Sequence, residues 1–166
     1  IDLECSGESV PVSKENLVVR AAELFLRATR GRRERADAGV HIKLTKHIPV
    51  AAGLGGGSSD AAATLRGLNE LYGMPCSPDD LAALGLQLGA DVPFFLIDAG
   101  AAHATGIGEI LKPIASITHL SILLVNPGFP VSTRWVYQTF ALTGSEIFSN
   151  LIPSQKDVSG VMSLGE

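Results

Sequence analysis

One short segment of the chain has the residue types that bind an anion such as phosphate. It runs from Pro49 to Ala61 with the sequence PVAAGLGGGSSDA, so four glycines and two serines lie close together. Glycine has no Cβ to block a ligand, so successive backbone N–H groups can turn toward an anion, and a following helix adds the positive end of its dipole. The segment therefore predicts a phosphate-binding loop. A flexible turn between a strand and a helix is the alternative interpretation.

Neither of the two commonest glycine-rich phosphate motifs fits this segment. A Walker A loop places a lysine after its second glycine, whereas Ser58 and Ser59 follow Gly57 here. A dinucleotide fingerprint needs a glycine where Ser58 stands, and no acidic residue ends a second strand about 20 residues later. A second glycine pair, Gly106 and Gly108, is typical of a hairpin turn. The sequence thus argues against a P-loop protein and against a nicotinamide-dependent oxidoreductase.

The residues around the loop predict a strand before it and a helix after it. Apolar and polar side chains alternate over residues 40–45, which is typical of a strand, and the pattern ends at Pro49. Apolar residues recur at helical spacing from Ser58 or Ser59 to near Gly73. A strand, a glycine loop and a helix therefore follow in the order that a phosphate site needs.

The rest of the chain predicts a mixed α/β fold. A helix is expected after Asn16, ending near Gly31. Another is expected behind the N-cap Ser77 and to run to about Gln87. Three further strands are predicted, over 99–105, 108–114 and 120–125. The strands are too unevenly spaced for a regular βαβ repeat.

Composition limits the class of protein. The 166 residues are 46% hydrophobic, enough for one domain or one domain and part of another. A formal net charge of −4 gives no electrostatic footprint for nucleic acid or an anionic membrane, and the basic run Arg30–Arg35 is interpreted as a solvated loop. Cys5 and Cys76 are too isolated for a disulfide framework or a zinc site, which favours a cytoplasmic setting. The chain starts without methionine, and its beginning looks cut away.

The glycine segment resembles the second motif of the GHMP small-molecule kinases, Pro-x-x-x-Gly-Leu-Gly-Ser-Ser-x-Ala, with one additional glycine. Four further stretches extend the resemblance over residues 12 to 142: NLVVRAA from Asn16, LGADVPFF from Leu88, GIGEIL from Gly106 and VNPG from Val125. The resemblance implies an α+β, GHMP-kinase-like two-domain fold that is incomplete in this chain. Residues 1–113 would be a partial ATP-binding N-terminal domain, and residues 114–166 would start the C-terminal domain.

The resemblance also implies which residues bind ATP. They are Pro49, Ala51, Ala52, Gly53, Leu54, Gly55, Gly56, Gly57, Ser58 and Ser59 of the loop, together with Lys46 and Asn16. The two serine hydroxyls either cap the helix or contact a phosphate oxygen or Mg²⁺. Lys46 either approaches the nucleotide or is solvated, and Asn16 either contacts adenine or serves only as a helix cap.

The same resemblance makes Asp91 the catalytic residue. An attacking hydroxyl must lose its proton, and a carboxylate within hydrogen-bond reach can accept it. In the family, the aspartate of this motif acts as that base or orients the hydroxyl, so Asp91 also belongs to the acceptor site. A turn residue after Gly89 is the alternative interpretation. Glu109 has a conceivable magnesium role, although a turn held by backbone amides explains it better.

The full motif strings are similar to one branch of the family, whose acceptor is a cytidine-diphosphate-linked methylerythritol. For that branch, Thr133 and Tyr137 would contact the acceptor, with Trp135 or Phe140 as alternative aromatic partners of cytosine. ATP and Mg²⁺ are the expected co-reactants, and neither nucleic acid nor a membrane is an expected partner. Four histidines show no metal-ligand pairing. Oligomeric state is not predicted.

Two other functions remain open at this point. A GHMP kinase for homoserine, mevalonate or a sugar would share the glycine loop but not the full GADVPFFL and GIGEIL strings. A nucleotide-binding module without turnover is compatible with the absence of the family's Lys-x-Asn-Leu, Asp-Gly-Tyr-His and Gly-Ser-Gly elements from this chain. ATP binding without phosphate transfer would distinguish that module from a kinase.

Overall fold

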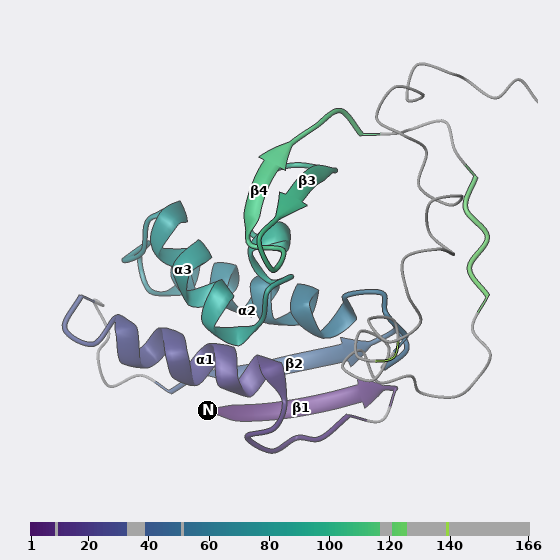
Figure 1. Cartoon of the computed structure of the whole chain (residues 1–166). Helices are drawn as coiled ribbons and strands as arrows, with labels where there is room; N and C mark the ends of the chain where they lie inside the picture. The colour runs from purple at the N-terminus through teal and green to yellow at the C-terminus, as the bar shows by residue number, and fades with distance from the viewer. Residues whose placement is uncertain (9, 33–38, 51, 117–120, 126–138, 140–166) are drawn as a thin grey trace, which may run out of the picture. The chain divides into compact units, whose positions relative to one another are not determined.

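The computed structural model describes residues 1–8, 10–32, 39–50, 52–116, 121–125 and 139 (Figure 1). All of these except the last belong to one compact unit, Ile1–Pro130, and Val131–Glu166 forms the second unit. The elements below belong to the first unit. The predicted division of the chain into two family domains at residues 113 and 114 stays a prediction.

Two parallel strands form the first sheet. β1 (Asp2–Gly7) pairs with β2 (His41–Lys46), with Cys5 opposite Leu44. The predicted strand over 40–45 is confirmed, whereas β1 was not predicted. Its alternation of acidic or polar residues with Leu3 and Cys5 is short, and it gains strand structure from its pairing with β2.

Helix α1 (Leu17–Ala28) connects the two strands and confirms the first predicted helix. Asn16 is its N-cap, and the Val18 N–H donates to Asn16 Oδ1 over 2.9 Å. The helix ends at Ala28 with Thr29 as its C-cap, close to the predicted end, and Gly31 just beyond it has a left-handed φ of 86°. One face of α1 enters the core that is shared by the three α-helices.

Helix α2 (Gly56–Leu71) begins two or three residues before the predicted start at Ser58 or Ser59. The sequence pattern placed Gly56 and Gly57 in the loop, but both belong to the first helical turn. Ala61 and Ala62 are buried against the core, as their small size predicts for a closely packed helix. The phosphate loop and the helix N-terminus are therefore one feature.

Helix α3 (Pro78–Leu88) confirms the predicted start and end. Ser77 and Asp80 form a capping box: the Asp80 N–H donates to Ser77 Oγ, and the Ser77 N–H donates to Asp80 Oδ2, both over 3.1 Å. A short 3₁₀ helix, η1 (Pro93–Phe95), follows and packs on α2 and α3.

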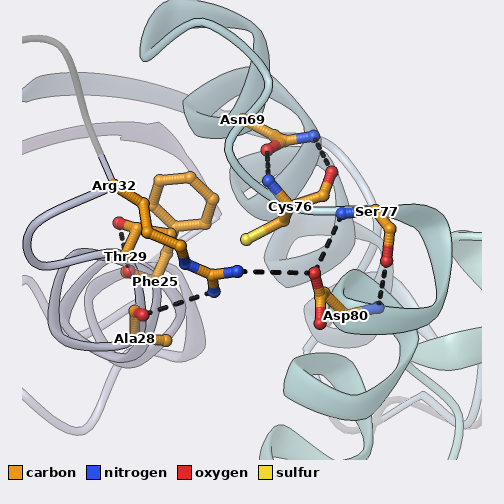
Figure 2. Close-up of polar contacts among 8 residues, drawn as sticks. All are labelled: Phe25, Ala28, Thr29, Arg32, Asn69, Cys76, Ser77 and Asp80. Carbon is orange, nitrogen blue, oxygen red and sulfur yellow. Dashed lines mark hydrogen bonds and ion pairs between the residues drawn. The ribbon is translucent and has the colours of Figure 1, made fainter.

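The turn between α2 and α3 is fixed by one buried side chain (Figure 2). Asn69 accepts a hydrogen bond from the Cys76 N–H over 2.9 Å and donates one to the Cys76 carbonyl over 3.0 Å. Met74 between them has a φ of 60°, a left-handed conformation that side chains rarely adopt. The two Asn69 bonds thus hold a turn that its own backbone disfavours.

The second sheet is the predicted hairpin. β3 (Ala102–Thr105) pairs antiparallel with β4 (Ile110–Pro113) across the turn 106–109. Glu109 Oε2 accepts a hydrogen bond from the Ile107 N–H over 2.7 Å, so the turn interpretation of Glu109 is confirmed.

One predicted strand is wrong over the residues that can be compared. Residues 121–125 have no regular structure, and Ile122 to Val125 expose between 66% and 86% of their surface. A continuous apolar run makes a strand only where a neighbouring strand accepts its hydrogen bonds, and within the described ranges none pairs with it. None of the helices described has the length and hydropathy needed to cross a bilayer.

Candidate active site

The glycine loop ends in backbone conformations that only glycine adopts easily. Gly53 and Gly55 have φ values of 72° and 67°, both in the left-handed region. Gly55 is the N-cap of α2 and offers no side-chain oxygen to the helix. By contrast, Asn16 and Ser77 cap α1 and α3 with their side chains.

The first turn of α2 consequently presents backbone donors without acceptors inside the helix. The first intrahelical bond runs from the Ser59 N–H to the Gly55 carbonyl over 2.9 Å, so the N–H groups of Gly56, Gly57 and Ser58 precede it. These donors lie at the positive end of a 16-residue helix. An anion is the ligand that this arrangement suits.

The serines do not cap this helix, so that interpretation of Ser58 and Ser59 is wrong. Both lie inside α2, at its third and fourth positions. The Ser59 hydroxyl donates to the Gly56 carbonyl over 2.9 Å, a bond to its own preceding turn. A contact of either hydroxyl with phosphate or Mg²⁺ stays a prediction.

Lys46 is buried, and its interpretation as a solvated strand-end lysine is wrong. Its side chain is 5% exposed, and Nζ lies 2.5 Å from Asp60 Oδ2. A Cβ on Gly56 would come within 2.8 Å of this ammonium. A cation beside a helix N-terminus is unfavourable alone, and the Asp60 carboxylate offsets that cost. The pair joins the end of β2 to the second turn of α2.

The side-chain amide of Asn16 makes hydrogen bonds through both its oxygen and its nitrogen. Oδ1 accepts from Val18, and Nδ2 donates to the Pro11 carbonyl over 2.7 Å. An amide has one further N–H and one further lone pair, so the predicted adenine contact remains untested.

The structure brings Asp91 to the glycine loop. Asp91 lies exposed in the turn between α3 and η1. With Gly53, Leu54 and Gly55 it lines an open pocket of about 270 Å³, which is bordered by residues of η1 and the hairpin. Those remaining lining residues are Phe94, Phe95, Ala104, Gly108 and Leu111. A carboxylate and the anion-binding loop thus share one pocket although they are some 40 positions apart in sequence.

Two larger hollows in the described part of the chain contain neither the glycine loop nor Asp91. One, of about 380 Å³, lies between β2 and α2, and the other, of about 390 Å³, lies between α1 and α3. Their larger size does not make them better candidates for an anion site, because neither is lined by the residues at the N-terminus of α2. Cys76 is no alternative nucleophile, since burial raises the pKa of its thiol.

Some predicted site residues are not placed in this pocket. Eight predicted ATP-site residues do not line this pocket: Asn16, Lys46, Pro49, Ala52, Gly56, Gly57, Ser58 and Ser59. Ala51, Thr133 and Tyr137 lie outside the described residues. Their predicted roles are therefore not tested by the geometry.

Sequence reasoning missed two residues that shape the site. The Phe95 ring occupies the space that a Cβ on Gly55 would need, with Cζ 2.8 Å from that position. Arg66 of α2 donates to the Leu96 carbonyl over 2.7 Å and to the Ile97 carbonyl over 3.4 Å. The phenylalanine pair in PFF was a visible signal, whereas an exposed helical arginine carries none.

A family comparison places the site in a known context. The family described as "GHMP kinases N terminal domain" matches residues 16–98, which is half of the chain. That range includes the glycine loop, helices α1 to α3 and Asp91.

Individual relatives agree with the family match. The 4-diphosphocytidyl-2-C-methyl-D-erythritol kinase of Geobacter metallireducens is 47% identical over 161 residues, 97% of this chain and 55% of the relative. The kinase of the same name from Desulfotalea psychrophila is 47% identical over 143 residues, 86% of this chain and 47% of the relative.

A solved structure shows the same fold. A crystal structure of 4-(cytidine 5'-diphospho)-2C-methyl-D-erythritol kinase matches 83% of this chain and 47% of that chain, with a TM-score of 0.62 and 42% identity. The chain spans about half the length of the curated relatives it matches.

Proposed function

Because the chain belongs to the GHMP kinase family, we propose that the protein transfers the γ-phosphate of ATP to a hydroxyl of a small molecule. The acceptor that its relatives' names support is 4-diphosphocytidyl-2-C-methyl-D-erythritol. The family resemblance implies that its 2-hydroxyl is the group phosphorylated. This reaction belongs to the methylerythritol phosphate route to isoprenoid precursors. A cytoplasmic location fits the two free cysteines.

One observation carries the proposal: Gly55, the N-cap of α2 that offers no capping side chain, lines the same pocket as Asp91. Phosphoryl transfer asks a protein mainly for positioning and for stabilisation of charge on the transferred group. The N–H groups of Gly56, Gly57 and Ser58 supply donors and the helix supplies its dipole. In the proposed complex, the Asp91 carboxylate would face the acceptor hydroxyl beside the terminal phosphate.

The proposed step uses Asp91 as proton acceptor. The acceptor oxygen forms a bond to the γ-phosphorus, the bond from that phosphorus to the bridging oxygen of ADP breaks, and the hydroxyl proton passes to the Asp91 carboxylate. The buried Lys46–Asp60 pair keeps the start of α2 beside the end of β2. The loop donors therefore stay oriented while charge moves across the phosphate oxygens.

Magnesium fits as an ion that arrives with the nucleotide. Mg²⁺ usually keeps several waters and takes one or two protein oxygens besides the phosphates. Across the part of the chain that is described, no group of three or more His, Cys, Asp or Glu side chains is arranged to hold a metal by itself. The Ser58 hydroxyl is the protein oxygen that would hold it beside the phosphates, and the ion would neutralise phosphate charge.

A phosphotransfer assay tests the proposal. The intact protein is incubated with ATP, Mg²⁺ and 4-diphosphocytidyl-2-C-methyl-D-erythritol, in parallel with homoserine, mevalonate and sugars. The expected result is ADP formation with the cytidylylated acceptor far above that with the others. Preference for another acceptor would overturn the substrate, and tight ATP binding without transfer to any of them would overturn the kinase proposal.

A further inference from the structure

The segment that carries Asp91 is held in place by contacts with three different parts of the fold. Towards α3, a Cβ on Gly85 would collide with Leu96 Cδ1 at 2.7 Å and approach Val92 Cγ1 at 3.1 Å. Val92 itself is completely buried. The residues that follow Asp91 therefore lie tightly on α3, while the acid itself stays exposed.

Towards α2, one long side chain adds two hydrogen bonds to the packing of η1 on that helix. Arg66 is exposed at the helix surface, and its guanidinium donates to two successive carbonyls, those of Leu96 and Ile97. These carbonyls lie just after η1, whose own C-cap is Leu96. A planar guanidinium can reach both, whereas a lysine ammonium is a point donor.

Towards the glycine loop, the segment makes direct contact through Phe95. Its ring fills the position of a missing Cβ on Gly55, the residue with left-handed φ that starts α2. Phe94 lies edge-on to Phe95, with ring centroids 5.3 Å apart, which limits the movement of the Phe95 ring. The loop that would hold phosphate and the segment that carries the acid are thus in contact.

We propose that Phe95 and Arg66 are positioning residues, which fix the distance between the glycine loop and the Asp91 carboxylate. The inference rests on the proposed phosphotransfer function. Phe95 limits how closely the two parts of the site approach, and Arg66 keeps the end of η1 on α2. Neither residue needs to contact the reacting atoms to affect the rate.

Misplacement of a reacting group by about 1 Å can lower a rate on the order of 10²-fold. We therefore expect Phe95→Leu and Arg66→Ala to lower kcat by roughly 10- to 100-fold in the intact protein. The affinity for a non-hydrolysable ATP analogue should stay within about twofold, because the N–H donors of α2 remain. Arg66→Lys should recover part of the loss, since it can still donate to one carbonyl.

Two controls separate positioning from stability. Phe25→Leu makes the same change in the core of α1, and Arg20→Ala removes an exposed arginine of α1 outside the pocket. Both should leave kcat within about twofold of the parent, although Phe25→Leu lowers the free energy of unfolding by a cavity effect. Melting temperatures of all variants show how much of each change is stability.

The outcomes are distinct. A parent enzyme that phosphorylates its acceptor while Phe95→Leu and Arg66→Ala keep its kcat would overturn the positioning proposal alone. Equal losses in the two controls would also overturn it, because the effect would then be general destabilisation. A parent protein that transfers phosphate to no acceptor would overturn the proposed function and this inference together.

Discussion

At the scale of single residues, the candidate site depends on glycines, whose missing Cβ leaves room for neighbouring side chains. Gly55 accommodates a left-handed backbone and leaves room for the Phe95 ring. Gly56 leaves room for the Lys46 ammonium in the same way. A larger residue at either position would push apart the parts of the site, so these glycines serve packing as well as ligand approach.

Asp91 provides the sharpest test at this scale. Replacing it with asparagine keeps its size but removes the carboxylate that would accept the proton. We expect Asp91→Asn to lower kcat by roughly 10²- to 10⁴-fold, with ATP affinity nearly unchanged. Steady-state kinetics and calorimetric titration with an ATP analogue measure the two effects. Near-normal turnover would remove Asp91 as the base.

The residue types of the site could be predicted from the sequence, but their partners could not. A glycine-rich segment between a strand and a helix is a recognisable pattern for an anion site, and a carboxylate is a recognisable candidate for a base. The pairing of Lys46 with Asp60 depends on how β2 and α2 lie in space, 14 positions apart. Lysine side chains are usually exposed, so a solvated Lys46 was one interpretation of the sequence. It is wrong because Lys46 is buried against Asp60.

At the scale of elements, the cap of α3 makes the stability of the protein depend on pH. The backbone N–H of Ser77, followed by the Ser77 side chain, holds the pKa of the Asp80 carboxyl below its usual value (Figure 2). A carboxyl with a lowered folded-state pKa stabilises the fold above its unfolded pKa of about 3.9, and that stability is lost as pH falls through the folded pKa.

We expect Asp80→Asn to remove this part of the pH dependence. The difference in the free energy of unfolding between parent and variant should be constant at neutral pH and shrink as the pH falls below about 4. Urea unfolding from pH 7 downward measures it, with the exposed Asp79→Asn as control because Asp79 is not part of the capping box. A difference that stays constant down to the lowest pH would contradict the assignment.

The turn between α2 and α3 predicts a larger effect on stability. Asn69→Ala would leave the N–H and carbonyl of Cys76 buried without their partner. Each unsatisfied group costs about 1–3 kcal/mol, so we expect the free energy of unfolding to fall by roughly 2–4 kcal/mol. Urea unfolding beside the exposed neighbour variant Glu70→Ala measures it. A loss no larger than that of Glu70→Ala would show that the turn holds without Asn69.

Most elements could be predicted because their ends carry local signals. Asn16 and Ser77 cap helices through their own side chains, so α1 and α3 start where the sequence indicates. The start of α2 was predicted two or three residues late because its cap, Gly55, has no such side chain. Strand β1 was not predicted, whereas residues 121–125 were predicted as a strand and are not one. Both errors arise because strand formation depends on a neighbouring strand, which the sequence of the segment itself does not specify.

At the scale of the whole molecule, the fold of the described unit agrees with the expectation from its motifs. The mixed α/β arrangement matches the solved kinase structure over about half of that chain. The residues predicted to contact the acceptor, Thr133 and Tyr137, lie in the part that the structure does not describe. The phosphate half of the proposed site is therefore supported by geometry, and the acceptor half rests on the relatives.

The most direct test of the account is a structure of the intact protein with a non-hydrolysable ATP analogue. We expect phosphate oxygens to accept hydrogen bonds from the N–H groups at the start of α2, and the terminal phosphate to face Asp91. A triphosphate bound away from Gly55–Ser58, or with its terminal phosphate turned from Asp91, would contradict it.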